Sequence, residues 1–264
     1  MQQLDHRTAA EALEAARTNR RAIAPLTEQY ERVTIDDAYQ IQSLQSAQRV
    51  ADGASVKGRK VGLSSRAMQS QLGVDSPDFG VLFDDMFHGE HDPIDVDRFL
   101  QPRIEPEIAF VLGRDLSGPS VTVAEALRAI DFLLPALEII DSRIEDWRIS
   151  IADTVADNAS SGGVVLGSTP TDIRDVDPRL LGCNLFSGGE LVATGAGGAV
   201  LGSPVLALVW LANTLGGHGV GLAAGDVVLP GSVTRAQVVG AGDTWSAHFA
   251  ELGPVTACFA GSSS

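Results

Sequence analysis

Cysteine and long apolar runs are both scarce in this sequence. Only Cys183 and Cys258 occur among 264 residues, too few for a disulfide framework, and we expect two buried thiols in a reducing cytoplasm. The longest apolar stretch, residues 204–213, is far shorter than a membrane span. The first residues contain no basic region followed by an apolar run, so no signal peptide is expected. Together these absences predict a cytoplasmic protein that does not associate with a membrane.

Positive charge is also in short supply. Lysine and arginine together number 19 against 34 aspartates and glutamates, which gives a formal net charge of −15. Such a chain has no basic footprint for phosphates, which excludes a nucleic-acid partner. An acidic surface also repels small carboxylates at long range. Any anionic ligand must therefore be captured locally, by a cation or a metal.

Lysine is the rarest of the charged residues, present only as Lys57 and Lys60. Arginine keeps its proton at accessible pH, whereas the pKa of a lysine can be tuned for proton transfer. Lys60 lies in a glycine-flanked strand, and near a metal its pKa would be lowered enough to exchange a proton with a substrate. Biased codon usage, or a surface salt bridge at Lys60, would leave the same pattern.

The hydrophobic pattern divides the chain into a helical N-terminal segment, residues 1–54, and a β-rich remainder, residues 55–264. Helices are expected at 7–22 and 34–52, with Thr34 and Asp37 as a cap of the second, and then at 66–72, 123–130 and 204–215. Strands are expected at 56–63, 103–112, 132–140, 164–166, 181–187, 190–194, 226–229, 236–239, 244–250 and 254–259. Because strands and helices do not alternate regularly, we expect an α+β fold with a mostly antiparallel or mixed sheet.

The strongest chemical signal is a pair of glutamates in the expected strand 103–112. Side chains alternate along a strand, so Glu105 and Glu107 point to one face, roughly 6.6 Å apart, while Ile104 and Ile108 point to the other. Two carboxylates on a half-buried strand repel each other and lose hydration unless a positive charge compensates. A hard divalent cation would do so, and an exposed edge strand with both glutamates in solvent is the alternative.

A third glutamate favours the metal site. Glu138 is the one charged residue in the apolar run 132–140, and a lone glutamate in such a strand is rarely buried without a partner. Three carboxylates from two buried strands would form an oxygen-rich site for a divalent metal. We therefore predict that Glu105, Glu107 and Glu138 hold a metal ion.

Each of three polar segments allows both a structural and a functional interpretation. Asp78, between Pro77 and Gly80, either caps a turn or acts as a general acid or base. The segments 157–163 and 231–235 either bind an anion through backbone amides or are ordinary loops. The hydroxyl side chains that we predict to contact a substrate from these loops are Ser160, Ser232 and Thr234.

Several motifs in fixed order resemble the 2-keto-4-pentenoate hydratase family, within the fumarylacetoacetate hydrolase superfamily. They are RKVGL at 59–63, GVDSPDFG at 73–80, QPRIEPEI at 101–108, PALE at 135–138, SRIEDW at 142–147 and ADNAS at 156–160. The resemblance covers nearly the whole chain, including the helical N-terminal segment. The segment LPGSVTR at 229–235 is most similar to hydratases that act on 2-hydroxyhexa-2,4-dienoate in bacterial steroid-ring degradation.

This resemblance implies that Glu105, Glu107 and Glu138 hold Mg²⁺ or Mn²⁺, and that Lys60 and Asp78 transfer protons. The implied fold is a mixed β-roll with flanking helices, in which residues 55–264 form the metal-binding catalytic domain. The implied reaction adds water to a small 2-hydroxy-2,4-dienoate, a pentadienoate or hexadienoate, to give a 4-hydroxy-2-oxo acid in aromatic or steroid ring catabolism. A homo-oligomer is expected, as is association with a pathway aldolase or decarboxylase.

The sequence departs from the superfamily pattern at one segment, and this difference narrows the range of possible reactions. Its hydrolases activate water with a histidine and a glutamate on a lid helix, and residues 64–72 contain neither, which disfavours hydrolysis of a carbon–carbon bond. Two alternatives to the hydratase stay open. One is a 2-oxo-3-hexenedioate (4-oxalocrotonate) decarboxylase, with an additional pocket for a second carboxylate, and the other is a non-catalytic partner subunit of such an enzyme. The residues that set substrate chain length are not identifiable from their spacing.

Overall fold

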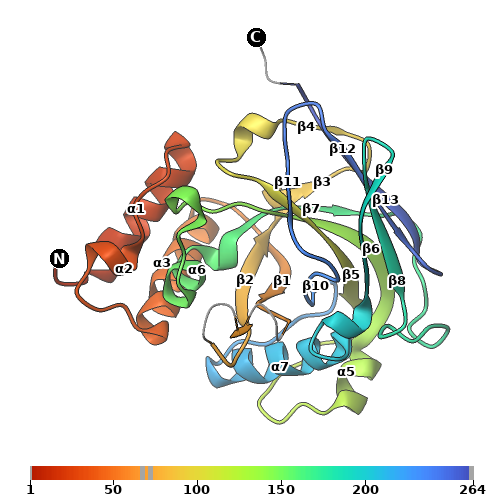
Figure 1. The fold of residues 1–264 in the computed structure, drawn as a ribbon. Coiled ribbons are helices and arrows are strands. Elements are labelled where there is room, and N and C mark those ends of the chain that lie inside the picture. The colour runs from red at the N-terminus through yellow and green to blue at the C-terminus, as the bar shows by residue number, and fades with distance from the viewer. Residues whose placement is uncertain (1, 66–68, 71–73, 262–264) are drawn as a thin grey trace.

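Two β-sheets form the centre of the computed structural model, which describes residues 2–65, 69–70 and 74–261 (Figure 1). The larger sheet contains β1 (Val56–Gly62), β2 (Asp78–Phe83), β3 (Phe87–His88), β5 (Arg103–Leu112), β6 (Ile130–Ile140), β7 (Ser161–Leu166), β10 (Val227–Leu229) and β11 (Gln237–Val238). Its order is β2-β1-β10-β5-β6-β7-β3, and β11 pairs with β5. The β1–β10 and β3–β7 pairs are parallel and the others antiparallel, so the expected mixed sheet is confirmed.

The smaller sheet covers one side of the larger one. Its strands are β4 (Pro93–Ile94), β8 (Gly182–Ser187), β9 (Glu190–Ala196), β12 (Thr244–Phe249) and β13 (Gly253–Phe259), in the order β4-β13-β12-β8-β9. The β8–β9 connection is a tight hairpin, in which Gly188 and Gly189 take φ angles of 56° and 89° that favour glycine. The largest group of buried apolar side chains lies between the sheets, with Leu137 from β6 and Val255 from β13 both inaccessible to solvent.

Two helices complete this core. The expected helices near 123–130 and 204–215 are present as α5 (Val123–Ala129) and α7 (Pro204–Gly217), which lie together below the sheets in Figure 1. Leu208 and Leu211 of α7 are fully buried against the large apolar group. None of the helices in the described part of the chain combines the length and apolar composition that a bilayer span needs.

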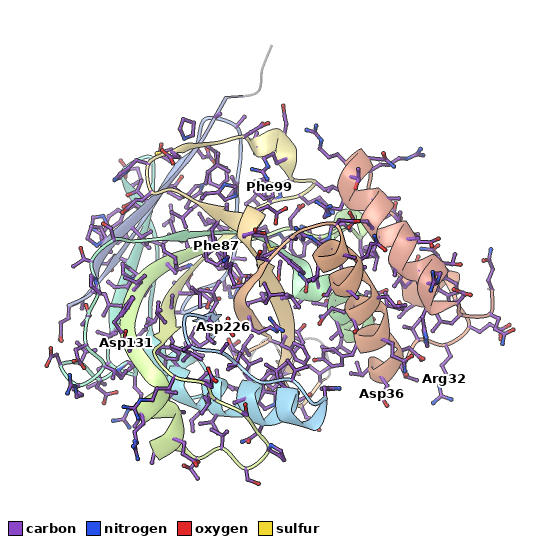
Figure 2. All side chains as sticks on the ribbon, turned by 180° about the vertical axis from the view of Figure 1, so that it is seen from behind. Arg32, Asp36, Phe87, Phe99, Asp131 and Asp226 are labelled. Atoms are coloured by element: carbon purple, nitrogen blue, oxygen red, sulfur yellow. The ribbon has the colours of Figure 1, made fainter. Side chains whose placement is uncertain are left out.

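The remaining helices gather on the opposite side of the larger sheet from the smaller one. They are α1 (His6–Asn19), α2 (Leu26–Gln29), α3 (Ile35–Ala51) and α6 (Ile151–Ala156), seen at the left of Figure 1, and Figure 2 labels Arg32 and Asp36 on this side. The expected cap of α3 is confirmed, since Thr34 Oγ1 and the Asp37 carboxylate accept from each other's backbone N–H groups. The second apolar group packs α1 and α3 on α6, so the N-terminal helices are tied to the middle of the chain. The proposed division at residue 54 stays a prediction.

Short 3₁₀ segments make several of the connections. They are η1 (Asp84–Met86), η2 (Val96–Arg98), η3 (Glu145–Trp147), η4 (Asn158–Ser160) and η5 (Gly197–Ala199). The expected helix at 66–72 falls mostly on residues 66–68 and 71–73, which lie outside the described residues.

The interpretation of Asp78 as a turn cap is wrong, because Asp78 begins strand β2 and pairs with Gly62 of β1. The glycine at position 80 is explained by close packing rather than by a turn. A Cβ atom at Gly80 would lie 2.5 Å from the Asn158 carbonyl oxygen, so a glycine is needed where another segment crosses the strand.

Candidate active site

The three predicted metal ligands meet on the antiparallel pair β5–β6. Glu105 lies directly opposite Glu138, and Glu107 is two residues further along β5 on the same face. Ligand oxygens of the three glutamates all lie within 4.8 Å of one another. Because β5 runs between β10 and β6, the alternative of an exposed edge strand is wrong. Glu107 and Glu138 are 0% and 1% exposed, and Glu105 is the most accessible of the three.

Burial and mutual repulsion disfavour the ionised form of this cluster. Burial raises the pKa of Glu107 well above its usual range, and the charges of Glu138 and Glu105 raise it further. Burial and the charge of Glu138 raise the pKa of Glu105 to about 7, while Lys60 opposes the shift. Oε1 of Glu107 and both carboxylate oxygens of Glu138 have no hydrogen-bond partner among the described residues. Buried carboxylate oxygens that lack a hydrogen bond and lie close together fit a hard divalent cation, which takes oxygen ligands.

Lys60 places a buried positive charge next to the glutamates. Its Nζ lies 3.3 Å from Glu138 Oε1 and donates a hydrogen bond to the Ala159 carbonyl at 2.9 Å. Burial opposes its charge, but the negative charges of Glu138 and Asp78 outweigh burial and raise the pKa of Lys60 above its usual value. In the field of the protein groups alone, the ammonium form is therefore favoured. The lowered pKa that we expect beside a bound cation stays a prediction, and the surface salt bridge at Lys60 is wrong.

Asp78 is held against the neighbouring strand. Its side chain is fully buried, and neither of its carboxylate oxygens has a hydrogen-bond partner among the described residues. A Cβ atom on Gly62 would lie 2.0 Å from Asp78 Oδ1, so this carboxylate occupies the space that the glycine leaves. Burial raises the pKa of Asp78 to about 6, and the charge of Lys60 limits the shift. A buried carboxyl that titrates near neutrality is suited to accept and return a proton.

The three predicted substrate-binding hydroxyls differ in their surroundings. Ser160 is buried next to Ala159, and its Oγ has no hydrogen-bond partner among the described residues. Ser232 forms a backbone bridge with Glu107, and its Oγ lies 3.4 Å from the Pro106 carbonyl. Thr234 Oγ1 donates to the Arg235 carbonyl. Ser160 and Ser232 therefore adjoin the residues of the site, whereas Thr234 is connected to it through Ser232, whose Oγ accepts from the Thr234 N–H at 3.3 Å.

Two backbone groups contact residues of the site, and the sequence does not predict either contact. The Ala159 carbonyl accepts from Lys60, and the Gly231 N–H donates to Glu107 Oε2 at 2.7 Å. The segment 231–235 therefore donates a backbone amide to a carboxylate of the chain itself, and binding of a ligand anion by this segment stays a prediction. The only sequence signal for this contact is Gly231, whose φ of 129° favours glycine.

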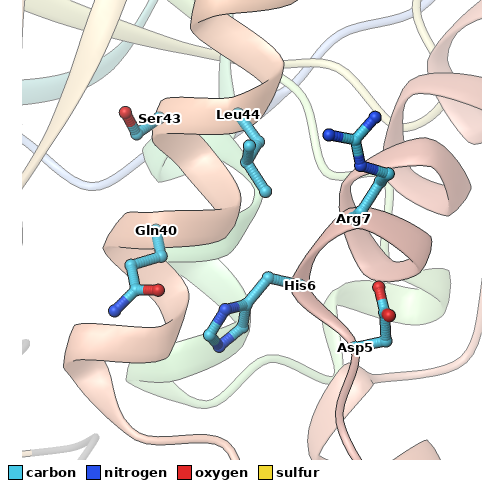
Figure 3. Close-up of a pocket in the computed structure, with 6 residues that line it drawn as sticks. All are labelled: Asp5, His6, Arg7, Gln40, Ser43 and Leu44. Atoms are coloured by element: carbon cyan, nitrogen blue, oxygen red, sulfur yellow. The ribbon is translucent and has the colours of Figure 1, made fainter.

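A surface pocket between α1 and α3 lies apart from this site (Figure 3). His6 projects from the start of α1 toward Gln40, Ser43 and Leu44 of α3, and its Nε2 lies 2.8 Å from Asp37 Oδ1. The pocket is open, and it lacks the buried, convergent polar groups that the carboxylate cluster has.

Comparison with known proteins gives one consistent family. The model of the fumarylacetoacetate (FAA) hydrolase C-terminal family matches residues 49–260. Two relatives are each 48% identical over 247 residues, 94% of this chain and 92% of the relative. They are 2-keto-4-pentenoate hydratase of Paraburkholderia xenovorans (strain LB400) and 2-keto-4-pentenoate hydratase 3 of Pseudomonas putida.

A solved structure matches equally far along the chain. It is 4-oxalocrotonate decarboxylase from Pseudomonas putida G7, complexed with magnesium and adipate, with 34% sequence identity and a TM-score of 0.94. The match covers 98% of this chain and 100% of that one.

Proposed function

The chain belongs to the 2-keto-4-pentenoate hydratase family, within the fumarylacetoacetate hydrolase superfamily, and we propose that it hydrates its substrate at Glu105, Glu107, Glu138, Lys60 and Asp78. It is a hydro-lyase of aromatic catabolism that converts 2-hydroxypenta-2,4-dienoate, the enol form of 2-keto-4-pentenoate, to a 4-hydroxy-2-oxo acid. The observation that carries the site assignment is the convergence of three glutamates, two of them fully buried, beside the buried Lys60, which among the described residues pairs with Glu138 alone.

The cofactor that we propose is Mg²⁺ or Mn²⁺, held by Glu105, Glu107 and Glu138. When bound, such a cation supplies the positive charge that holds the substrate carboxylate and C2 oxygen and draws electron density from the conjugated chain. The presence of magnesium in the solved decarboxylase supports this choice, as does the all-oxygen donor set. Gly231 keeps Glu107 oriented through its backbone N–H.

The first half of the reaction converts the dienol to an unsaturated ketone. The carboxylate of Asp78 accepts the proton of the C2 hydroxyl, and the ammonium of Lys60 donates a proton to C5. The double bonds shift so that the C3–C4 bond becomes the remaining alkene, conjugated with the new C2 carbonyl. Lys60 begins as an ammonium group, and Asp78, whose pKa burial raises to about 6, can hold a proton near neutrality.

The second half adds water across C3 and C4. The neutral amine of Lys60 takes a proton from water as the oxygen bonds to C4, and Asp78 returns its proton to C3. Both residues regain their starting protonation states, and the substrate has gained one molecule of water. Burial of both side chains limits exchange of these protons with bulk solvent.

Substrate contacts are proposed for the hydroxyl groups near the glutamates. The Ser160 Oγ is buried and free to donate to a substrate oxygen, which makes it the best placed of the three. Ser232 is proposed to contact the substrate beside Glu107. Thr234, whose N–H donates to Ser232 Oγ, is proposed as a further contact from the same loop.

Decarboxylation of 2-oxo-3-hexenedioate is the second candidate, because the solved decarboxylase shares nearly the whole fold. Arg103 precedes Glu105 on the same face of β5 and stacks over Trp147 at 4.3 Å, where it could receive a second carboxylate. The higher identity to the hydratases, 48% against 34%, favours hydration.

We also propose that the chain acts as a homo-oligomer in the cytoplasm. Apolar side chains on its surface include Leu180, Leu191 and Val238, which are 77%, 55% and 72% exposed, and association would remove them from water. Association with a pathway aldolase or decarboxylase stays a prediction.

The test is to assay the isolated chain with Mg²⁺ for loss of dienol absorbance, using pentadienoate, hexadienoate and 2-oxo-3-hexenedioate. We expect turnover of a dienoate that a chelator abolishes and Mg²⁺ or Mn²⁺ restores. If release of carbon dioxide from 2-oxo-3-hexenedioate is the dominant activity, the chain is a decarboxylase and the proposed hydration is wrong. Full turnover in the chelator would contradict the metal site, and an inactive but metal-binding chain would make it a partner subunit.

A further inference from the structure

The turn that carries the Ala159 carbonyl has an unusual backbone. Asn158, Ala159 and Ser160 have φ angles of 52°, 51° and 54°, so three successive non-glycine residues are left-handed. Each such residue is disfavoured in an isolated chain, and a run of three persists only where the surrounding structure enforces it. This turn, defined here as residues 157–161, joins helix α6 to strand β7 and delivers a carbonyl to Lys60.

A single guanidinium fastens both ends of the turn. Arg143 Nε and Nη2 donate to the carboxylate and the carbonyl of Asp157, and Nη1 donates to the Ser161 carbonyl at 2.9 Å. Nη1 also donates to the Asp141 carbonyl at 2.7 Å. Arg143 and Asp157 are 6% and 1% exposed, so the pair is screened little by solvent. The planar fork of an arginine can bind several acceptors at once, which an ammonium cannot.

The middle of the turn is fastened to strand β2. The side-chain amide of Asn158 accepts from Val81 N at 2.8 Å and donates to the Val81 carbonyl at 2.9 Å. Gly80 permits this close approach, since a side chain there would collide with the turn. The turn is thus bound to the strand that begins at Asp78 and to the end of the strand that carries Glu138.

We propose that Arg143 is a positioning residue, which holds the turn 157–161 in its left-handed form so that the Ala159 carbonyl fixes Lys60 Nζ beside Glu138. Arg143 touches neither Lys60 nor the glutamates in the described contacts, so it acts through the turn. The same arrangement leaves the Ser160 Oγ buried and without a hydrogen-bond partner in the described part of the chain, so that it can bind a ligand. The catalytic part of this proposal rests on the proposed function, whereas the position of Lys60 does not.

The scarcity of lysine makes the position of Lys60 directly measurable. The chain contains only Lys57 and Lys60, on the same strand, with Lys57 exposed. Lysine labelled with ¹³C and ¹⁵N in the side chain should therefore give two sets of NMR signals. Exchange of the Lys60 Nζ protons with water should be slow in the folded protein, and Lys57 serves as an internal reference.

Two variants test the proposal. Arg143→Lys keeps a positive charge opposite Asp157 but loses the fork, and its additional lysine signal is recognised by its absence from the unchanged protein. The double variant Arg143→Gln with Asp157→Asn removes both charges, so that neither is buried alone if the first variant folds poorly. Arg148→Gln is the matched control, because Arg148 is exposed and pairs with Glu28 and Glu145 on the surface.

We expect faster exchange and a shifted signal for Lys60 in both variants, with Lys57 unchanged. A fall of about 10²-fold in kcat with little change in KM or Mg²⁺ affinity should accompany it, as for a catalytic group displaced by about 1 Å. The control should match the unchanged protein. Folded variants of lowered Tm whose Lys60 signals and kcat stay unchanged would show that Arg143 only stabilises the fold, which overturns the proposal. If the unchanged protein lacks hydratase activity, the proposed function fails, and the NMR comparison still decides the position of Lys60.

Discussion

Lys60 Nζ lies 3.3 Å from Glu138 Oε1, although the two residues come from strands that are not neighbours in the sheet. Their pairing neutralises one of the four carboxyl groups gathered here, which belong to Glu105, Glu107, Glu138 and Asp78. Removing either partner from a buried ion pair leaves the other charge uncompensated. The remaining negative charge of the carboxyl groups favours binding of a divalent cation between them.

Replacing Glu107 by glutamine should weaken metal binding while keeping the shape of the side chain. We expect Mg²⁺ affinity to fall by about 10²-fold or more, since even residues that only support a metal ligand contribute 10–100-fold. Turnover should fall with it. Calorimetric titration with Mg²⁺ measures the affinity, and Glu190→Gln on exposed strand β9 is the control. If the Glu107→Gln variant binds Mg²⁺ with unchanged affinity, Glu107 is not a metal ligand.

Replacing Lys60 by methionine should separate proton transfer from metal binding. The variant keeps all three glutamates, so Mg²⁺ should still bind, whereas kcat should fall by about 10²–10⁴-fold as expected for loss of a general acid. Lys57→Met changes the other lysine of β1, which is exposed, and should leave both quantities unaltered. Equal losses in the two variants would mean that the general fall in charge, rather than Lys60, matters.

Stability of the chelator-treated protein should decrease as pH rises toward neutrality. Burial and the charge of Glu138 raise the pKa of Glu105 from 4.5 to about 7. Between these values the folded protein binds more protons than the unfolded chain, so the free energy of unfolding falls with increasing pH. Urea denaturation at about pH 5 and about pH 8 measures the change.

Saturating Mg²⁺ should oppose this trend, because the cation binds ionised carboxylates and its affinity therefore increases with pH. The Tm shift produced by Mg²⁺ should be larger at about pH 8 than at about pH 5. A chelator-treated protein that gains stability over this interval would contradict the buried, uncompensated state of Glu105.

Gly62→Ala should disturb Asp78 selectively. The added Cβ would lie 2.0 Å from Asp78 Oδ1, so the carboxylate must move, and a displacement of about 1 Å is enough to reduce kcat by about 10²-fold. Mg²⁺ affinity should be retained. Gly182→Ala is the matched control in a strand of the other sheet, since a Cβ there meets no atom within 4 Å. Steady-state kinetics and Mg²⁺ titration of both variants distinguish these outcomes.

The sequence was informative wherever local pattern and burial agree. Alternation placed Glu105 and Glu107 on one face, and the apolar residues around Glu138 indicated a buried partner, as the β5–β6 register confirms. The cap at Thr34 is also a local feature, set within a few residues. These elements need little from the rest of the chain to form.

Prediction failed where distant segments decide the local conformation. Asp78 lies in a strand although Pro77 and Gly80 are typical of turns. Gly80 is needed because the Asn158 backbone, from another part of the chain, packs closely against it. Helix α6 was not expected, and it is too short to show a helical period. The left-handed turn at 157–161 depends on Arg143, and no local propensity of Asn158, Ala159 and Ser160 would indicate it.

The parallel pairing of β1 with β10 has a consequence for synthesis on the ribosome. Val227–Leu229 supply the strand between β1 and β5, and Gly231 supplies the amide for Glu107, so most of the polypeptide must emerge before the sheet can close. Until then the acidic side chains of β5 and β6 remain hydrated, and they lose water together only when this late segment inserts. A nascent chain halted before β10 should therefore be unable to sequester a metal ion.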